Sequence, residues 1–368
     1  MLHIPLYQPD LSGNERAYLL EAFDSGWISS KGRFVAAFES AFAVQVGFAH
    51  AISVCNGTAA LHLALLALGI GVGDEVLVPT LTYVATVNAI RHVGATPVFV
   101  DADAQTWQID VADARRRISP RTRAALAVHL YGGSCDLHAL RSLCRDHDLR
   151  LIEDCAEAIG NRFDGEHVGR GADAATFSFF GNKTLSTGEG GMVVCMDDTV
   201  ADRVRRLRGQ GLVPGHEYWH DIAGYNYRMT NLCAAIGLAQ LERIATTLAS
   251  KRRLDARYRS ALAGSALRFQ CHHDDDQPSH WMTSVLTPEP GQRDPLRAAL
   301  AAAGIETRPL FSPVHLMPMY DGRRGAFPVA EDLSGRGLNL PSWPDLSESQ
   351  VAHVTATILD HLEQQGCG

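Results

Sequence analysis

One lysine, Lys183, lies in a segment that can give an amine unusual reactivity. Residues 176–191 read TFSFFGNKTLSTGEGG, an apolar run that leads into a polar, glycine-rich turn, and a second apolar run follows at residues 192–196. This pattern predicts strand, loop and strand, with the lysine at the rim of a sheet. A lysine that loses water there has a lowered pKa, and its amine can form a Schiff base with an aldehyde cofactor such as pyridoxal 5'-phosphate. A single loop lysine is also an ordinary surface charge, so the prediction depends on the other groups that such a cofactor needs.

A phosphate cradle is predicted near Gly57 and Thr58. Residues 51–54 are typical of a short strand, residues 55–58 (CNGT) of a turn, and residues 59–68 of an apolar helix. A glycine-bearing turn between strand and helix points free backbone N–H groups at an anion. The turn is not a Walker A loop, because no Lys-Ser/Thr pair follows the glycine. Residues 69–74 (GIGVGD) follow a helix and precede a strand, the wrong order for a dinucleotide fingerprint, so we interpret them as a helix stop and turn.

Two further side chains suit a pyridine ring. Asp154 follows the apolar run that ends at Glu153, and a carboxylate there could keep a pyridine nitrogen protonated. The alternative is a helix N-cap for residues 155–159. Tyr83 follows a predicted strand and offers a flat face for the ring, with an ordinary core aromatic as the alternative.

Short apolar runs alternate with helical patterns over the first two thirds of the chain. The runs are residues 75–78, 97–100, 124–130 and 150–153, and the helical patterns are residues 84–92, 137–147 and 231–243, after two earlier helices at 12–25 and 33–46. Such alternation predicts an α/β fold with a mostly parallel sheet covered by helices. Ligands in such folds bind beyond the carboxyl ends of the strands, where Thr58, Tyr83, Asp154 and Ser178 are expected.

From about residue 246 the pattern changes. A long polar helix at residues 247–262 is followed by predicted strands at 280–287 and 304–307, a helix between them at 295–303, and a last amphipathic helix at 347–364. We therefore expect a large α/β domain with an N-terminal arm at residues 1–245 and a small α+β domain at residues 246–368. The histidine- and aspartate-rich residues 272–276 are interpreted as a solvated loop, and no metal-ligand spacing is found, so no metal is expected. Residues 209–229 form an aromatic, glycine-rich loop.

The composition argues against several classes of protein. The chain has 368 residues and a net charge of −8, with no basic block, which argues against nucleic acid as a partner. No apolar run approaches the roughly 20 residues that span a bilayer, so no membrane partner is expected. The start lacks the pattern of a signal peptide, and the eight cysteines are scattered without a C-x-x-C pair, which favours reduced thiols and a cytoplasmic protein.

The chain resembles the pyridoxal-phosphate aminotransferases of the DegT/DnrJ/EryC1/StrS family, which act on nucleotide-linked keto-sugars. The resemblance extends from about Ile4 to Ser347. The motifs that carry it occur in order: WISS at 27–30, NGT at 56–58, PTLTY at 79–83, EDCAE at 153–157, SFFGNK at 178–183, TGEGG at 187–191 and NYRMTN at 226–231. The resemblance implies fold type I, with a large, mostly parallel seven-stranded sheet between helices and a smaller C-terminal α+β domain.

The resemblance also implies roles for single residues. Lys183 matches the family's Schiff-base lysine and Asp154 the carboxylate on the pyridine nitrogen, so these two are the expected catalytic residues. Tyr83 matches the aromatic that stacks on the ring. One branch of the family, which removes a hydroxyl, carries His in place of Lys183, and the lysine argues against that branch.

The phosphate cradle of the family is matched by Gly57, Thr58 and Ser178. Glu157 stands beside the cofactor, where many relatives carry His. Asn226 matches a residue that reaches the phosphate from the neighbouring subunit, so the resemblance implies a homodimer with active sites at the subunit interface.

Within the family, the phrases WISSKG at 27–32, TFSFFGN at 176–182, YWH at 218–220, ETRP at 306–309 and PVHLMPMY at 313–320 most resemble the branch that aminates C4 of GDP-4-keto-6-deoxymannose, with L-glutamate as the family's usual donor. The cofactor would alternate between pyridoxal and pyridoxamine 5'-phosphate. The residues expected to bind the nucleotide sugar are Trp27, Ser29, Ser30, Lys31, Tyr83, Arg228, His315 and Tyr320.

Three alternatives remain open on the sequence. The first is the same chemistry on a dTDP- or UDP-linked keto-sugar, at C4 or C3. The second is a non-enzymatic or regulatory member of the family, against which the intact set Lys183, Asp154 and Ser178 argues. The third is a nicotinamide-dependent dehydrogenase, which would need a glycine fingerprint after the first strand, and none is present there.

Overall fold

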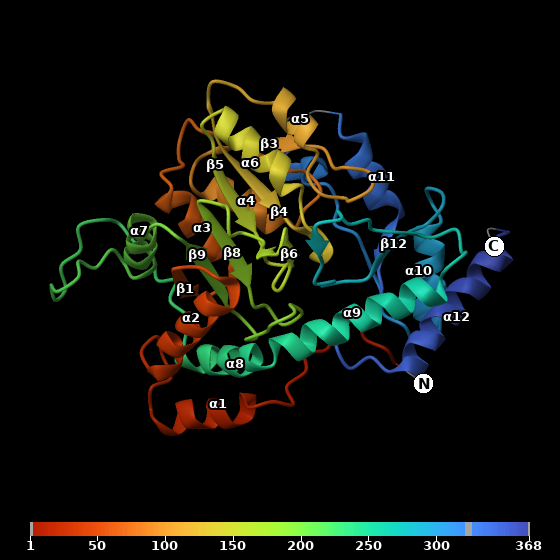
Figure 1. The fold of residues 1–368 in the computed structure, drawn as a ribbon, viewed down its shortest axis with the longest axis horizontal. Helices are drawn as coiled ribbons and strands as arrows, with labels where there is room; N and C mark the ends of the chain where they lie inside the picture. Colours follow the sequence, from red (N-terminus) through yellow and green to blue (C-terminus); the bar gives the residue numbers. More distant parts are fainter. Residues whose placement is uncertain (1–2, 321–325, 367–368) are drawn as a thin grey trace.

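A seven-stranded sheet forms the centre of the computed structural model, which describes residues 3–320 and 326–366 (Figure 1). Its strand order is β1-β9-β8-β5-β4-β2-β3. The bounds are β1 His50–Val54, β2 Glu75–Pro79, β3 Thr96–Val100, β4 Thr122–Val128, β5 Arg150–Asp154, β8 Ala174–Ser178 and β9 Gly191–Cys195. Only β9 runs against its neighbours, so the prediction of a mostly parallel sheet is confirmed.

Helices cover both faces of this sheet. The helices of this part are α1 Glu15–Asp24, α2 Arg33–Val46, α3 Gly57–Ala67, α4 Val84–His92, α5 Val111–Arg116, α6 Leu137–Asp146, α7 Asp198–Arg208 and α8 Asn231–Glu242. Helices α2, α6 and α8 share one hydrophobic core with the sheet, whereas α3, α4 and α7 pack on the opposite face. Because helices exclude water from both faces, the strands are mostly apolar, as in β2, whose five residues are all buried and, apart from Glu75, apolar.

A second, four-stranded antiparallel sheet lies in the C-terminal part, in the order β10-β12-β14-β13. Its strands are β10 Arg268–Phe269, β12 Ser284–Leu286, β13 Arg308–Pro309 and β14 Gly337–Asn339, and the accompanying helices are α9 Ile244–Ala261, α10 Arg293–Ala302, α11 Pro328–Arg336 and α12 Glu348–Gln364. The long helix α9 runs from one part to the other (Figure 1), contributing Leu248 to the first core and Leu254 and Tyr258 to the core under this sheet. The division at residues 245 and 246 stays a prediction.

The N-terminal arm joins the C-terminal part rather than the large sheet. The N–H of Ile4 donates to the carbonyl of Gly304 at 2.8 Å, and the carbonyl of Ile4 accepts from the N–H of Glu306 at 2.9 Å. This pairing explains why the strand expected at residues 304–307 is wrong: that stretch makes a single bridge to the arm, and the strand begins only at Arg308.

Two other expectations fail in the same region. The strand expected at residues 280–287 is confined to Ser284–Leu286, because His280 has a left-handed φ of 50° and interrupts the extended chain. The solvated loop expected at residues 272–276 is only partly present: Asp274 and Asp275 are exposed in a turn, whereas Asp276 is not. Asp276 has a fully buried side chain that accepts a hydrogen bond from Ser134 Oγ at 2.6 Å, and it begins the short strand β11 Asp276–Gln277. That strand pairs with β6 Arg162–Phe163, which pairs with β7 Glu166–His167.

Helices α5, α7 and α11 and the short strands β6, β7, β10, β11 and β14 lie outside the predicted elements. Over the described residues no single helix is long and apolar enough to cross a membrane, and only α8 and α9 together, bent by 63° at their junction, pass on length and composition.

Candidate active site

A cavity of about 600 Å³ lies beyond the carboxyl ends of the parallel strands, between the large sheet and residues of the C-terminal part. All seven residues expected around the cofactor within one chain line it: Gly57, Thr58, Tyr83, Asp154, Glu157, Ser178 and Lys183. They come from the ends of β1, β2, β5 and β8, so strands that are distant in sequence converge on one edge of the sheet.

Lys183 is held from three sides. Its Nζ lies 3.3 Å from Glu157 Oε1 and 3.9 Å from the centre of the Trp281 ring. Its backbone carbonyl accepts the hydroxyl of Tyr7 at 2.8 Å. The lysine side chain is only 13% exposed, so it is no ordinary surface charge. An amine in such a position can act as a nucleophile and move protons.

Asp154 ends β5 and is fully buried. Its Oδ2 accepts the hydroxyl of Thr86 at 2.8 Å, and its Oδ1 accepts the N–H of Ala156 at 3.1 Å. Burial raises the pKa of Asp154, because a desolvated carboxylate is costly without a cation. The alternative prediction of a helix N-cap is wrong, since residues 155–159 form turns and no helix. A buried carboxylate aimed into a cavity suits a protonated ring nitrogen.

The start of α3 is built to approach an anion closely. Asn56 caps the helix by accepting the N–H of Ala59 at 2.8 Å, and the preceding N–H groups of the first turn have no intrahelical acceptor. A Cβ at Gly57 would lie 2.9 Å from Cβ of Ser178, so only glycine lets the helix come this near β8. A phosphate fits between these N–H groups and the hydroxyls of Thr58 and Ser178.

Tyr83 and Glu157 complete the wall. Tyr83 precedes α4 with a side chain 58% exposed, so the alternative of a core aromatic is wrong. Its ring lies 5.6 Å from that of Phe311. Glu157 is buried, and its Oε2 accepts the N–H of Tyr131 at 2.8 Å. Burial raises the pKa of Glu157, and the nearby ammonium of Lys183 opposes that rise.

This set of groups fits pyridoxal 5'-phosphate. An amine, a carboxylate for the ring nitrogen, a helix N-terminus for the phosphate and an aromatic face all line one cavity. In addition, Thr176 Oγ1 is buried in the cavity wall with no hydrogen-bond partner among the described residues, a polar atom that a bound ligand would satisfy.

Eight of the predicted residues do not line the cavity of the single chain: Trp27, Ser29, Ser30, Lys31, Asn226, Arg228, His315 and Tyr320. Asn226 and Arg228 are exposed, and the loop at Trp27 is fastened to the start of α8 by Asn231, whose Nδ2 donates to the carbonyl of Trp27 at 2.7 Å. The role of Asn226 requires a second subunit and stays a prediction.

His315 and Tyr320 have structural partners instead. His315 Nδ1 lies 2.6 Å from Thr80 Oγ1, and its side chain is 6% exposed. The hydroxyl of Tyr320 donates to Asn88 Oδ1 at 2.7 Å, and the residue is buried. His315 therefore anchors residues 314–320 to the end of β2 and Tyr320 anchors them to α4, so the predicted contacts with a sugar lack support in the single chain.

Several residues of the wall were not predicted as site residues. They are Leu6, Thr86, Glu189, Trp281, Met282, Arg308, Phe311 and Asn339, among others. Trp281 and Arg308 lie in segments whose predicted strands are displaced. The only sequence signal for Arg308 is its position in the ETRP phrase at residues 306–309, which the resemblance covers.

Comparisons with known proteins agree with this geometry. Residues 9–359 match the model of the DegT/DnrJ/EryC1/StrS aminotransferase family. A GDP-perosamine synthase of Escherichia coli O157:H7 is 51% identical over 358 residues, covering 97% of this chain and 98% of that protein. A GDP-perosamine synthase of Vibrio cholerae is 49% identical over 363 residues, covering 98% and 99%. The crystal structure of DesV from S. venezuelae, solved with a ketimine intermediate, superposes with a TM-score of 0.90 at 37% identity and covers 94% of each chain. The fold class expected from the resemblance, fold type I, is confirmed.

Proposed function

Because the chain belongs to the DegT/DnrJ/EryC1/StrS aminotransferase family, we propose that it transfers an amino group from L-glutamate to C4 of GDP-4-keto-6-deoxymannose and so makes GDP-perosamine. The observation that supports this substrate most strongly is the near full-length similarity to two GDP-perosamine synthases. The cavity supports the reaction class, since it brings the amine of Lys183 and the carboxylate of Asp154 together.

The cofactor would be pyridoxal 5'-phosphate, which withdraws electrons from the reacting carbon and carries the amino group, as pyridoxamine 5'-phosphate, between the two halves of the reaction. The first turn of α3, with Thr58 and Ser178, binds its phosphate. Asp154 sets a negative charge against the ring nitrogen, and Tyr83 covers the ring.

Lys183 moves the proton. Its amine takes a proton from the α-carbon of the amino donor and returns it to the carbon next to the ring, as general base and then as general acid. The same amine performs the reverse steps on the sugar. Since donor and acceptor use one cavity in turn, 2-oxoglutarate leaves before the sugar enters, and initial rates follow ping-pong kinetics.

The enzyme would act as a homodimer, in which Asn226 of one subunit contributes to the phosphate site of the other. The exposed position of Asn226, outside the cavity of its own chain, supports this arrangement.

A panel of substrates tests the proposal. The purified enzyme is given L-glutamate and, separately, GDP-4-keto-6-deoxymannose, dTDP-4-keto-6-deoxyglucose and UDP-4-keto-6-deoxyglucose, and the amino sugar is measured by mass spectrometry. We expect the largest kcat/KM with the GDP sugar. A preference for a dTDP or UDP sugar would keep the mechanism and refute the substrate. No amination of any of them would refute the proposed reaction.

A further inference from the structure

Two side chains hold the amine of Lys183 from different directions, and neither belongs to the phosphate cradle. Glu157 Oε1 lies 3.3 Å from Lys183 Nζ, and the ring of Trp281 lies 3.9 Å from the same atom. Both partners are 4% exposed. Trp281 also donates its Nε1–H to the carbonyl of Asn182 at 2.7 Å, which fixes the indole beside the lysine loop.

Tyr131 supports both partners at once. Its N–H donates to Glu157 Oε2 at 2.8 Å, which leaves Oε1 to face the lysine. Its ring is parallel to that of Trp281, with an angle of 1° and a centroid distance of 6.3 Å. Tyr131 has a left-handed φ of 58°, and its hydroxyl accepts the N–H of Phe311 at 2.9 Å. A non-glycine residue held in this backbone region by several contacts is typical of a functional site.

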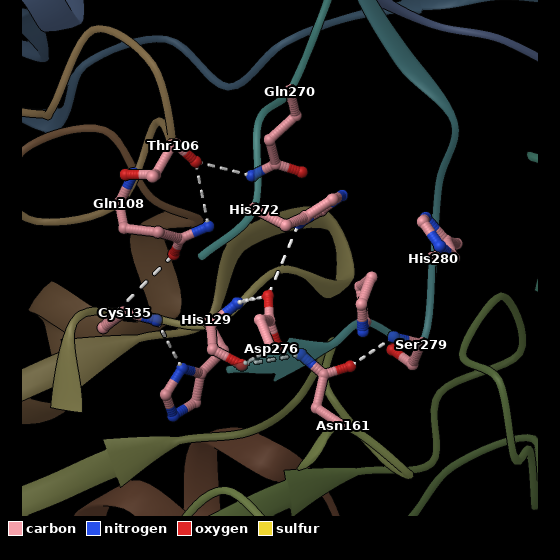
Figure 2. A network of polar contacts seen from close by, with 12 residues as sticks. Thr106, Gln108, His129, Cys135, Asn161, Gln270, His272, Asp276, Ser279 and His280 are labelled. Atoms are coloured by element: carbon pink, nitrogen blue, oxygen red, sulfur yellow. Dashed lines mark hydrogen bonds and ion pairs between the residues drawn. The ribbon is translucent and has the colours of Figure 1, made fainter. Parts of the chain in front are cut away.

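The segment that carries Trp281 is fastened to the large domain. The N–H of Ser279 donates to the carbonyl of Gly132 at 3.0 Å and also to Asn161 Oδ1, and the N–H of Met282 donates to the carbonyl of Tyr131 at 3.3 Å. Figure 2 shows Asn161 and Ser279 joined, within a polar network that continues to Asp276 and His272. A Cβ at Gly132 would lie 2.4 Å from the N of Trp281, so the two segments touch through their backbones.

An ammonium in this cavity needs such partners. When Lys183 takes a proton from the donor it becomes a cation, and a charge away from water is costly unless it is paired. A carboxylate supplies the opposite charge, and the face of an indole attracts a cation further. The other charged side chains that line the cavity are Asp154, Glu189 and Arg308, and none of them forms an ion pair with Lys183 within the described part of the chain.

We propose that Glu157 and the indole face of Trp281 form the position in which Lys183 rests as an ammonium whenever it is not attached to the cofactor. The inference rests on the proposed function in one respect, since it takes Lys183 as the catalytic amine. Glu157 and Trp281 act on the reacting nitrogen directly, whereas Tyr131, Ser279 and Asn161 are positioning residues.

Chemical labelling of Lys183 in the cofactor-free protein tests the proposal without any turnover. The protein is labelled with an amine-specific reagent over a range of pH, and the modified Lys183 peptide is quantified by mass spectrometry. In Glu157→Gln the amide still accepts the Tyr131 N–H, so the fold is kept, but the charge is lost. We expect Lys183 to be labelled at least about tenfold faster at neutral pH, because an ammonium without its carboxylate partner releases its proton more readily. Glu166→Gln replaces an exposed carboxylate in β7, so it is the matched control and should leave the labelling rate unchanged.

Substitutions of Trp281 measure the contribution of the indole separately from that of the Glu157 charge. Trp281→Phe keeps an aromatic face and should speed the labelling of Lys183 less than Trp281→Leu does. The far-ultraviolet circular dichroism of each variant is compared with that of the wild type to check folding. If Trp281→Leu does not fold, the result for Glu157→Gln alone decides the proposal. An unchanged labelling rate of Lys183 in Glu157→Gln overturns the proposal.

The half-reaction with L-glutamate provides the second measurement. With cofactor bound, Glu157→Gln should release 2-oxoglutarate in a single turnover at least about tenfold more slowly than the wild type, because the ammonium that forms on Lys183 has lost its carboxylate partner. A wild type that releases no 2-oxoglutarate would refute the proposed function. The labelling result on the cofactor-free protein would still decide whether Glu157 and Trp281 hold the amine.

Discussion

Replacement of Asp154 by asparagine should have opposite effects on catalysis and on the stability of the cofactor-free protein. The asparagine occupies the same space between Thr86 and the N–H of Ala156, so it removes the charge with little change of shape. A hydrogen bond to a charged group contributes about 1.5–3 kcal/mol, against about 1 kcal/mol for a neutral one. If the variant loses up to about 2 kcal/mol of the stabilisation of the transition state, the rate of the L-glutamate half-reaction falls about thirtyfold.

Stability without cofactor should change in the other direction. Burial raises the pKa of Asp154 above its ordinary value of 3.8, so the folded protein binds this proton more tightly than the unfolded chain. The wild type therefore loses stability as the pH rises from 3.8 through the raised value, and Asp154→Asn does not. At neutral pH the cofactor-free variant should unfold at a higher temperature than the wild type, by about 1–2 °C for each 1 kcal/mol relieved.

Thermal unfolding with and without pyridoxal 5'-phosphate, together with the single-turnover rate, measures both effects. Cofactor should raise the unfolding temperature of the wild type more than that of Asp154→Asn. Asp202→Asn, an exposed carboxylate on α7, is the matched control and should behave as the wild type. The assignment of Asp154 to the ring nitrogen would be refuted if Asp154→Asn kept the wild-type half-reaction rate and if cofactor raised its unfolding temperature as much as that of the wild type.

Three further predictions concern the cradle, the subunit interface and a buried lysine. Gly57→Ala places a methyl group 2.9 Å from Cβ of Ser178 and should weaken cofactor binding at least about tenfold in an equilibrium titration, with equal affinity as the contradicting result. Asn226→Ala mixed with Lys183→Ala should regain activity after subunit exchange, because one site of the mixed dimer is intact; activity no greater than the sum of the separate variants would refute the shared site. Burial lowers the pKa of Lys251 to about 7, so its neutral form favours folding, and the stability that it contributes is present at high pH and lost as the pH falls through 7. The deficit of Lys251→Met in chemical unfolding should therefore grow between pH 7 and pH 10, and a deficit that is constant over this range would contradict it.

The sequence predicted those parts of the site that are formed by residues close together in the chain. The phosphate cradle at Gly57 depends on a strand, a turn and a helix that adjoin in the chain, and Lys183 stands between two strands that pair with each other. Helices α2 and α4 have the predicted bounds, because their apolar periodicity and the residues that flank them lie within one short stretch of the sequence.

The features that the sequence did not predict depend on contacts between residues that are far apart in the chain. Trp281 reaches Lys183 because His280 leaves the extended conformation and Ser279 is tied to Gly132, and neither contact has a periodic signal. Ile305 makes a single bridge to Ile4, some 300 residues away, so residues 304–307 did not form the expected strand. The residues expected to contact the sugar depend on a second subunit or on the ligand, which no local pattern encodes.

The transfer of one amino group per active site tests the central claim most directly. The enzyme is incubated with L-glutamate, separated from free amino acid by gel filtration, and then mixed with GDP-4-keto-6-deoxymannose alone. The account predicts about one equivalent of GDP-perosamine per site from the wild type and none from Lys183→Ala. Amino sugar from Lys183→Ala at the wild-type level, or none from a wild type that has released 2-oxoglutarate, would contradict it.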